Sequence, residues 1–348
     1  MKPPIPPVNP DVWKDLYAAA ARFKALTPWN VLDDMAPACF TDPSDGEMGY
    51  GLTMGSGGTI FGFCLYRGAE GFDRYRRLMD GSLDPEGDDY YAVLNCLKLE
   101  FGSRNELEKE DHGVIRALGL SFKGEHGWPG FRSFLPGYFP WFLTEVEAQF
   151  LTLGLDVACH HHEEVVKGRI EESIRDGECL VYRAADGAHG RFRSRWQPWP
   201  EYAPRSVPPV LHLERLAALR GKQVKRDGPW EAGVFYQPVP IMEGDRPFFM
   251  RGVAACQQSS GFVFGTDLAR PEESVGQLLA DAICSAIEKA GMKPDMIFVK
   301  HEDVEPLMPF ASALGLTIRP LKNLRTIFML KKAMLEDFLG GGKRRRKR

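Results

Sequence analysis

The chain has 348 residues, which is long enough for about two domains that each bury a core of their own. Hydrophobic residues make up 44% and charged residues 26% of it, as is ordinary for a globular protein, and no apolar run reaches the roughly 20 residues of a membrane helix. The start, MKPPIPPVNP, lacks the basic and then apolar order of a secretory signal, so we expect a cytoplasmic protein. The seven scattered cysteines indicate reduced, mostly buried thiols, and they suggest neither a disulfide framework nor a CxxC zinc site.

The first half begins with an amphipathic helix. Asn9 before Pro10 is a favourable helix start, and apolar residues at helical spacing continue to about Thr27. Three β segments follow at about 37–41, 48–54 and 58–66, separated by turn-forming residues rich in glycine. These segments predict a meander of antiparallel strands.

Helices and strands alternate through the rest of the first half. Capping boxes begin two of the helices, and prolines restrict the fifth strand to a few residues. A helix is an alternative for the fourth strand, because several of its residues have little β preference. In chain order we expect a helix from Gly68 to about Met79, a fourth strand within 91–99, a helix from Asn105 to about Leu118, a fifth strand at about 131–135, and a helix capped by Thr144 with Glu147 that ends near Val166.

The second half repeats this order after a connecting region. Residues 178–184 and 190–197 indicate a hairpin around Asp186-Gly187, and the five prolines of 198–209 mark the clearest domain boundary. Beyond it we expect a helix at 211–219, strands at 233–240, 247–256 and 261–267, a helix from Pro271 to Gly291, a buried parallel strand at 296–299, a helix at 304–314, a strand at 316–318, and a helix from Asn323 to about Leu339.

The predicted fold class is therefore α/β with mixed sheets. Each half has a meander of three strands followed by alternating helices and strands, an order that resembles the ribonuclease H-like fold. We predict an N-terminal lobe at 1–168, a hairpin and proline-rich linker at 169–210, a C-terminal lobe at 211–339 and a basic flexible tail at 340–348. Internal duplication is inferred from the order of elements alone.

The tail is basic although the net charge of the chain is −3. Its basic residues follow three glycines and are Lys343, Arg344, Arg345, Arg346, Lys347 and Arg348. Such a tail can contact nucleic acid, an anionic membrane surface or an acidic protein. A solvated terminus without a partner is the alternative that we favour.

Several stretches resemble known proteins. PWNVLD, DGEMGYGLTMG, YRGAEGF and FRSFLPGYFPW look like an uncharacterised bacterial family built from domains of unknown function, and this resemblance implies no activity. The shorter FTDPSDGEMGYG, residues 40–51, is similar to the first strand of ribonuclease H, where an aspartate follows an aromatic residue and a threonine.

That second resemblance implies a metal-dependent nuclease or phosphoryl-transfer enzyme. Two Mg²⁺ or Mn²⁺ ions would need three or four carboxylates from different elements. The candidates at matching elements are Asp42, Glu70, Asp73, Glu100 and Glu147. The alternative for Asp42 is a turn residue, because Pro43 and Asp45-Gly46 follow it. The strand VFYQPVPIM of the second half contains no acid, which argues against a nuclease site there.

Two other clusters have a functional and a structural interpretation. Histidines 160–162 near a helix end could bind a metal, but adjacent helical residues point about 100° apart, so we favour a solvated last turn in which protonated histidines suit the helix dipole. The aromatic residues of 128–141, with Arg132 and Trp141, could stack nucleic-acid bases, although core packing is the commoner role.

No reaction is indicated by any motif, and no cofactor is expected outside the nuclease hypothesis. The sequence favours a binding or regulatory protein over an enzyme. The nuclease and a nucleic-acid or acidic-partner function of the tail remain as alternatives.

Overall fold

The chain divides into two compact units in the computed structural model. Unit 1 comprises Met1–Tyr202 with Glu243–Pro247, and unit 2 comprises Ala203–Met242 with Phe248–Arg348. The structure describes residues 9–85, 89–170, 175, 177–184, 192–202, 207–221 and 225–344, and the side chains of Pro238 and of 337–344 are not among those described. The predicted turn at Asp186-Gly187 and residues 345–348 of the predicted tail lie outside these ranges, as do the side chains of Lys343 and Arg344.

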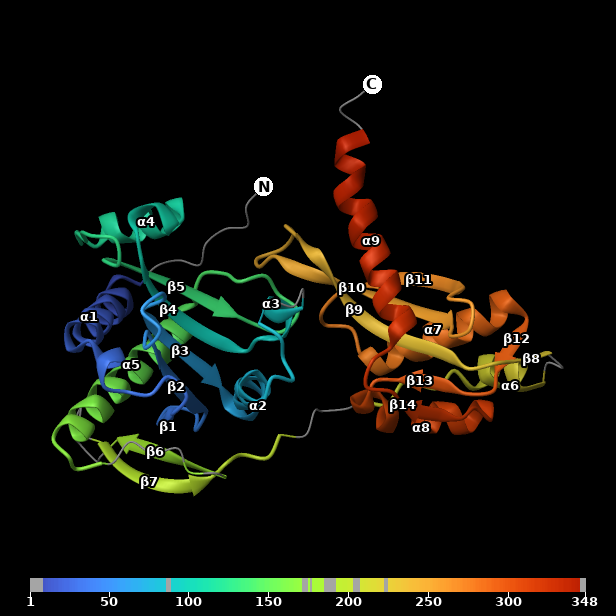
Figure 1. Cartoon of the computed structure of the whole chain (residues 1–348), viewed down its shortest axis with the longest axis horizontal. Helices are drawn as coiled ribbons and strands as arrows, with labels where there is room; N and C mark the ends of the chain where they lie inside the picture. The colour runs from blue at the N-terminus through green and yellow to red at the C-terminus, as the bar shows by residue number, and fades with distance from the viewer. Residues whose placement is uncertain are drawn as a thin grey trace. The chain divides into compact units, whose positions relative to one another are not determined.

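Unit 1 is built on one mixed sheet of seven strands (Figure 1). In sheet order these are β5 (Trp128–Phe134), β4 (Cys96–Gly102), β3 (Gly62–Arg67), β2 (Met48–Met54), β1 (Ala38–Thr41), β6 (Glu178–Ala184) and β7 (Phe192–Pro198). Neighbouring strands are antiparallel except β1 and β6, which pair in parallel. The hairpin that we placed in the connecting region is therefore part of this sheet.

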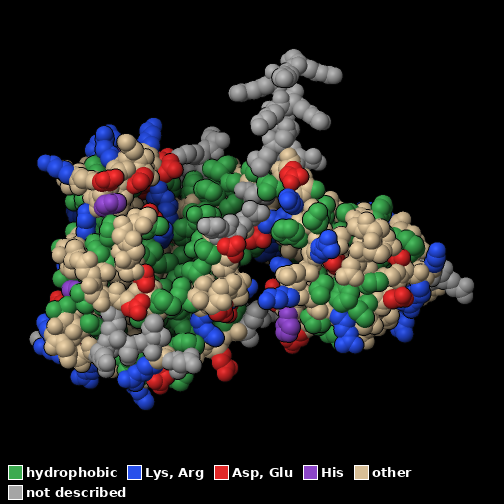
Figure 2. Space-filling model, in the orientation of Figure 1, with side chains coloured by type: hydrophobic (Ala, Val, Ile, Leu, Met, Phe, Trp, Pro, Cys, Tyr) green, Lys and Arg blue, Asp and Glu red, His purple; other side chains and the backbone are tan. Residues whose placement is uncertain are grey.

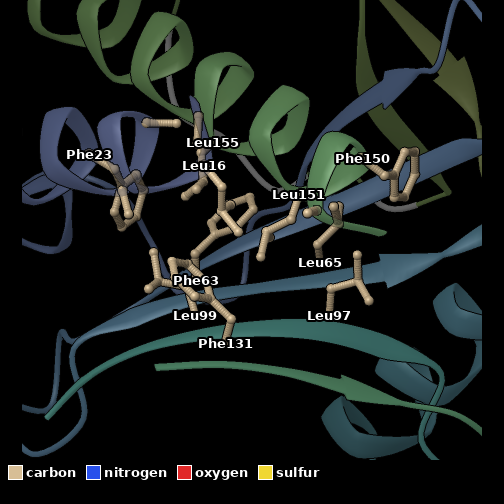
Figure 3. Close-up of a cluster of buried hydrophobic side chains, with 14 of the residues drawn as sticks. Leu16, Phe23, Phe63, Leu65, Leu97, Leu99, Phe131, Phe150, Leu151 and Leu155 are labelled. Carbon is tan, nitrogen blue, oxygen red and sulfur yellow. The ribbon is translucent and has the colours of Figure 1, made fainter. Parts of the chain in front are cut away.

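Helices cover both faces of the sheet in unit 1. They are α1 (Pro10–Leu26), α2 (Gly68–Met79), α3 (Tyr90–Val93), α4 (Lys109–Ala117) and α5 (Glu145–Val166), with short 3-10 turns at Pro28–Asn30 and Arg104–Glu106. α1 and α5 pack on one face over a core that includes Leu65, Leu97 and Leu99 (Figure 3). α2 lies on the other face, over Tyr50 and Tyr66. Alternate strand residues point to opposite faces, and both sets are apolar because both faces are covered.

Glycines in β2 make room for the aromatic side chains of this core. A Cβ atom at Gly49 would lie 2.4 Å from the ring of Phe40, and one at Gly51 would lie 2.3 Å from the ring of Phe63. Side chains at these positions would therefore displace the two rings. The alternation of glycine and larger residues in MGYGLTM thus reflects two faces with different space available.

Unit 2 has a mixed sheet of five strands in the order β11 (Val263–Ala269), β10 (Phe248–Gln257), β9 (Trp230–Ile241), β13 (Ile297–Val299) and β14 (Ile318–Pro320). The first three form an antiparallel meander, and β13 and β14 continue from β9 in parallel. α6 (Leu213–Gly221), α7 (Val275–Ala290) and α8 (His301–Leu314) share one core with this sheet, and α9 (Arg325–Arg344) packs on a second core. β8 (Lys225–Asp227) and β12 (Met292–Pro294), which we did not predict, form a small parallel pair.

The two halves share an order of elements but not a sheet topology. In unit 1, β4 pairs with β3 and β5 pairs with β4, both in antiparallel fashion, and the parallel partner of β1 is β6. In unit 2, β13 adds in parallel to β9, the first strand of the meander. The mixed α/β class is confirmed in both units, whereas the ribonuclease H-like order is not confirmed for the chain as a whole.

Several predicted boundaries were wrong for local reasons. Tyr91 and Val93 lie in the helical turn α3, so the fourth strand begins only at Cys96. The helix expected from Asn105 begins at Lys109, after a 3-10 turn that has its own capping box at Ser103. Pro129 lies inside β5, which tolerates it because β5 is at the edge of the sheet.

Three predicted features of unit 2 differ from the structure. α7 begins at Val275 behind the cap residue Ser274, not at Pro271. β9 begins at Trp230 and therefore contains Glu231, so the statement that this strand has no acid was wrong. α9 continues through the three glycines to Arg344, where we expected the helix to end near Leu339 and a flexible tail to begin.

Candidate functional site

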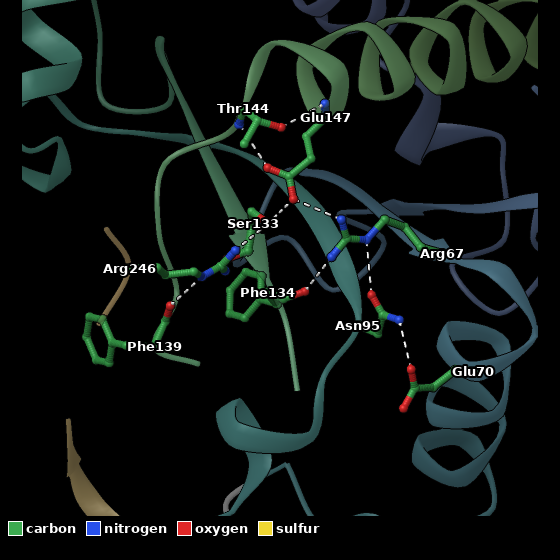
Figure 4. A network of polar contacts seen from close by, with 9 residues as sticks. All are labelled: Arg67, Glu70, Asn95, Ser133, Phe134, Phe139, Thr144, Glu147 and Arg246. Carbon is green, nitrogen blue, oxygen red and sulfur yellow. Dashed lines mark hydrogen bonds and ion pairs between the residues drawn. The ribbon is translucent and has the colours of Figure 1, made fainter. Parts of the chain in front are cut away.

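A buried network of polar side chains lies where β3 ends in unit 1 (Figure 4). Arg67, the last residue of β3, pairs with Glu147 of α5 at 2.8 Å between Nη1 and Oε1, and the two side chains are only 12% and 11% exposed. The guanidinium also donates to Asn95 Oδ1 at 3.0 Å and to the Phe134 carbonyl at 3.0 Å. Strand, helix and loop are joined through this one arginine.

Glu147 has further partners on both carboxylate oxygens. Ser133 Oγ donates to Oε1 at 2.5 Å, and the backbone N–H of Thr144 donates to Oε2 at 2.8 Å in the capping box of α5. Arg246, from the Glu243–Pro247 segment of unit 1, donates to Ser133 Oγ at 3.2 Å and to the Ser133 and Phe139 carbonyls. Burial lowers the pKa of Arg246 to about 10, although the charge of Glu147 acts in the opposite direction.

The carboxylates that the nuclease hypothesis needs all have partners inside the fold. Asp42 Oδ1 accepts from the backbone N–H and the hydroxyl of Ser44 at 2.8 and 2.7 Å, so Asp42 forms a turn. Glu70 accepts from Asn95 at 3.2 Å and Asp73 pairs with Arg74 at 3.0 Å. Glu147 belongs to the network above.

Glu100 lies at the other end of the sheet. The register of β3 and β4 pairs Cys96 with Tyr66 and Glu100 with Gly62, so Glu100 is four residues along β4 from the end at which Glu70 lies. At about 3.4 Å per residue this is a separation of about 14 Å. The structure therefore does not bring Glu100 together with the other candidates, and it shows no metal-sized group of three His, Cys, Asp or Glu side chains within the described residues.

Arg132 and Trp141 lie in packed surroundings. Arg132 makes two hydrogen bonds to the carboxylate of Asp111, at 3.0 and 2.8 Å, and lies over the ring of Phe142 at 4.7 Å. Trp141 is 8% exposed and Phe131 is 2% exposed. This part of the aromatic segment packs against the sheet and leaves little ring surface on which a base could stack.

The histidine cluster contradicts the solvated helix end that we expected. His161 and His162 are buried, because the last turns of α5 pack against β6, and His161 Nδ1 lies 2.7 Å from the hydroxyl of Tyr182. Burial, with the charges of the neighbouring histidines, lowers the pKa of His161 to about 4. The neutral imidazole is therefore the form that the fold accommodates.

This burial predicts loss of stability in acid. The folded pKa of His161 is below the ordinary value of 6.5, so the contribution of its neutral side chain to the free energy of unfolding is complete above pH 6.5. This contribution is lost as the pH falls towards 4, by up to about 1.4 kcal/mol per pH unit. His161→Gln, which cannot be protonated, should reduce the slope of unfolding free energy against pH in this window. The exposed His126→Gln serves as the control, and equal slopes for both variants would contradict the assignment.

A cleft lies on the α2 face of the sheet in unit 1. Its volume is about 540 Å³. Its lining comes from β2, β3, β4, the end of β5, α2, α3 and neighbouring loops, and consists of Asp34, Met35, Leu52, Met54, Ile60, Cys64, Tyr66, Leu78, Met79, Tyr90, Tyr91, Leu94, Cys96, Lys98 and Phe134. Hydrophobic side chains form a band over this unit in Figure 2, whereas charged side chains are scattered around it.

The rim of this cleft exposes large apolar side chains. Met35, Ile60, Met79 and Tyr91 are between 40% and 54% exposed. Exposed apolar residues are ordinary when they are scattered, but a group of them around one hollow is typical of a binding site. The cleft therefore has an apolar wall that continues to the surface.

Lys98 supplies the cation of the cleft. Its Nζ lies 2.7 Å from Glu100 Oε2, and its side chain is 28% exposed. Burial acts to lower the pKa of Lys98, but the hydrogen bond and charge of Glu100 outweigh it, so the pKa is raised. The ammonium group has three N–H donors and Glu100 occupies one of them, which leaves donors for another anion.

The thiols in the wall differ in acidity. A hydrogen bond from Cys96, and the nearby charge of Lys98, lower the pKa of Cys64 despite its burial, whereas the pKa of Cys96 is raised well above its ordinary value. Cys64 and Lys98 are direct cross-strand partners. Cys64, Cys96 and Lys98 thus lie on two adjacent strands.

No sequence motif marks this cleft. The local signal is that β2 and β3 carry apolar residues on both faces, which indicates covered faces but not an open cleft. The space between α2, α3 and the sheet depends on how these elements pack.

The two units and their mixed sheets define a two-domain protein of mixed α/β class. Residues 13–182 match the family model described as Domain of unknown function (DUF7309), and residues 215–335 match the one described as Domain of unknown function (DUF6930). The predicted resemblance to domains of unknown function is confirmed to this extent. No match to a curated protein or to a solved structure was found. In the described part of the chain, every helix is too short or too polar to cross a membrane.

Proposed function

We propose that this is a binding protein, and that the cleft of unit 1 holds a small apolar or aromatic molecule with one anionic group. The apolar rim around a hollow of about 540 Å³ carries this proposal. Small-molecule sites are commonly clefts of about 300–1,000 Å³ with apolar walls and few polar groups. Lys98 is the polar group that selects for negative charge.

The test uses 8-anilinonaphthalene-1-sulfonate, an aromatic probe with one sulfonate, and follows its fluorescence in a titration of the full chain. We expect saturable binding at one site. Ile60→Glu combined with Met79→Glu should weaken it at least tenfold, because both side chains are on the apolar rim. Val146→Glu, a change of the same kind at a residue that is 72% exposed on α5, should leave it unchanged.

A second comparison separates the roles of wall and cation. Lys98→Gln should weaken binding of the sulfonate probe but not of an uncharged naphthalene derivative of similar size. Equal affinity of the rim double variant and the wild type for both probes would show that the cleft is not the site.

For the architecture of unit 2, we propose the ribonuclease H-like arrangement. The order β11-β10-β9-β13-β14, with an antiparallel meander and two parallel strands added to its first strand, supports this assignment. The likeness concerns the fold alone and carries no activity. Glu231, the acid on β9, accepts backbone hydrogen bonds from Thr326 and Ile327 and so has a structural role.

A further inference from the structure

Three arginines lie together on one face of the β6–β7 hairpin. The antiparallel register places Arg183 directly opposite Arg193, and Val181 opposite Arg195. Since residues two apart in a strand share a face, Arg193 and Arg195 are neighbours on the same side, about 6.7 Å apart along β7. All three side chains are exposed, and among the described residues no carboxylate pairs with any of them.

This arrangement disfavours the folded hairpin on its own. Like charges that face each other across a strand pair are destabilising, and no described acid offsets them. Edge strands often carry charges that prevent aggregation, but this would need arginines only on β7. Arg183 is on the inner strand β6, which edge protection does not explain. An anionic partner would explain all three.

The edge of the sheet indicates the conformation in which a partner can bind. β7 is the last strand of the sheet, and in the part of the chain that the structure describes no strand pairs with its outer side. Its outward N–H and C=O groups can therefore accept an added strand. A hollow of about 470 Å³ extends along the hairpin and includes all three arginines in its lining.

We propose that β7 binds an acidic segment of a partner protein in extended conformation. Alternate residues of an added strand repeat at about the same 6.7 Å as Arg193 and Arg195, so acids at alternate positions would face the arginines. Single-stranded nucleic acid fits less well, because stacking needs an aromatic ring beside the arginines. Trp196 also lines the hollow, but its side chain is on the opposite face of the hairpin, where Arg175 covers its ring at 4.0 Å.

The experiment measures fluorescence anisotropy of a labelled ten-residue peptide of alternating Glu and Thr with the full chain at low salt. We expect saturable binding that Arg193→Glu with Arg195→Glu weakens at least tenfold. Arg116→Glu with Lys123→Glu makes the same change of charge at exposed positions elsewhere in unit 1 and should leave the affinity within twofold.

Two further probes test the mode of binding. A peptide in which proline replaces every threonine keeps the charge but cannot add as a strand, so it should bind at least tenfold more weakly. Equal binding of the proline peptide, or tighter arginine-dependent binding of a single-stranded oligonucleotide, would overturn the proposal. Equal losses in the hairpin and control variants would also overturn it.

Stability of the unbound protein gives an independent check. Arg193→Thr removes the facing like charge and introduces a residue that favours strands, so the Tm should be unchanged or higher and peptide affinity should fall. A clear fall in Tm would show that Arg193 serves the fold rather than a partner.

Discussion

Replacing Glu147 with alanine is expected to lower the free energy of unfolding of unit 1 by about 3–5 kcal/mol, because the change leaves the buried Arg67 without its counter-ion. The same change also removes the acceptor of the Ser133 hydroxyl and the capping interaction with Thr144. Small domains are stable by about 5–15 kcal/mol, so this is a large share of the total. Equilibrium unfolding in urea, followed by circular dichroism, measures it.

The matched control is an ion pair of the same kind at the surface. Arg22 and Asp156 also join two helices, but their side chains are 55% and 35% exposed. Asp156→Ala should therefore cost no more than about 1 kcal/mol. If Glu147→Ala were equally mild, the network would not be the junction between β3, β5 and α5 that its contacts indicate.

Replacing Glu231 with alanine should destabilise unit 2 by about 2–4 kcal/mol, because a buried acceptor of two backbone N–H groups at the start of α9 is lost. Glu231 is fully buried, and Thr326 N donates to its Oε2 at 2.7 Å. Its negative charge also lies at the positive end of the helix dipole. Glu231→Gln retains an acceptor and should cost less.

Hydrogen exchange identifies the cause of this loss. In Glu231→Ala, the amides of Thr326 and Ile327 should exchange faster than they do in the wild type, whereas the amides of α7 should exchange as before. Glu305→Ala, at an exposed position on α8, should change the free energy of unfolding by no more than about 0.5 kcal/mol. Unchanged protection at the start of α9 would contradict the capping role.

Local sequence determined many of the elements. The cap at Asn9, the glycine at the start of α2 and the capping box at Thr144 predicted three helices of unit 1 with correct starts, because capping depends on residues close in the chain. The antiparallel meanders followed from turn residues between β segments. The capping box expected at Asn105 failed because a competing one begins two residues earlier.

Tertiary structure decided how these elements pair and what they form. β1 pairs in parallel with β6, about 140 positions further along the chain, and α9 is capped by Glu231 and not by the nearby Asn323. No local pattern encodes either contact. The candidate carboxylates were recognised as residue types, but their partners were not visible in the sequence.

The apolar cleft, the buried ion-pair network and the three arginines of the hairpin all depend on side chains brought together by sheet register and helix packing. Sequence by itself determined most of the segments that form helices and strands and which of their faces are apolar, because these depend on neighbouring residues. Only the tertiary structure decided where those faces remain open and where charges meet, because both follow from contacts between residues far apart in the chain.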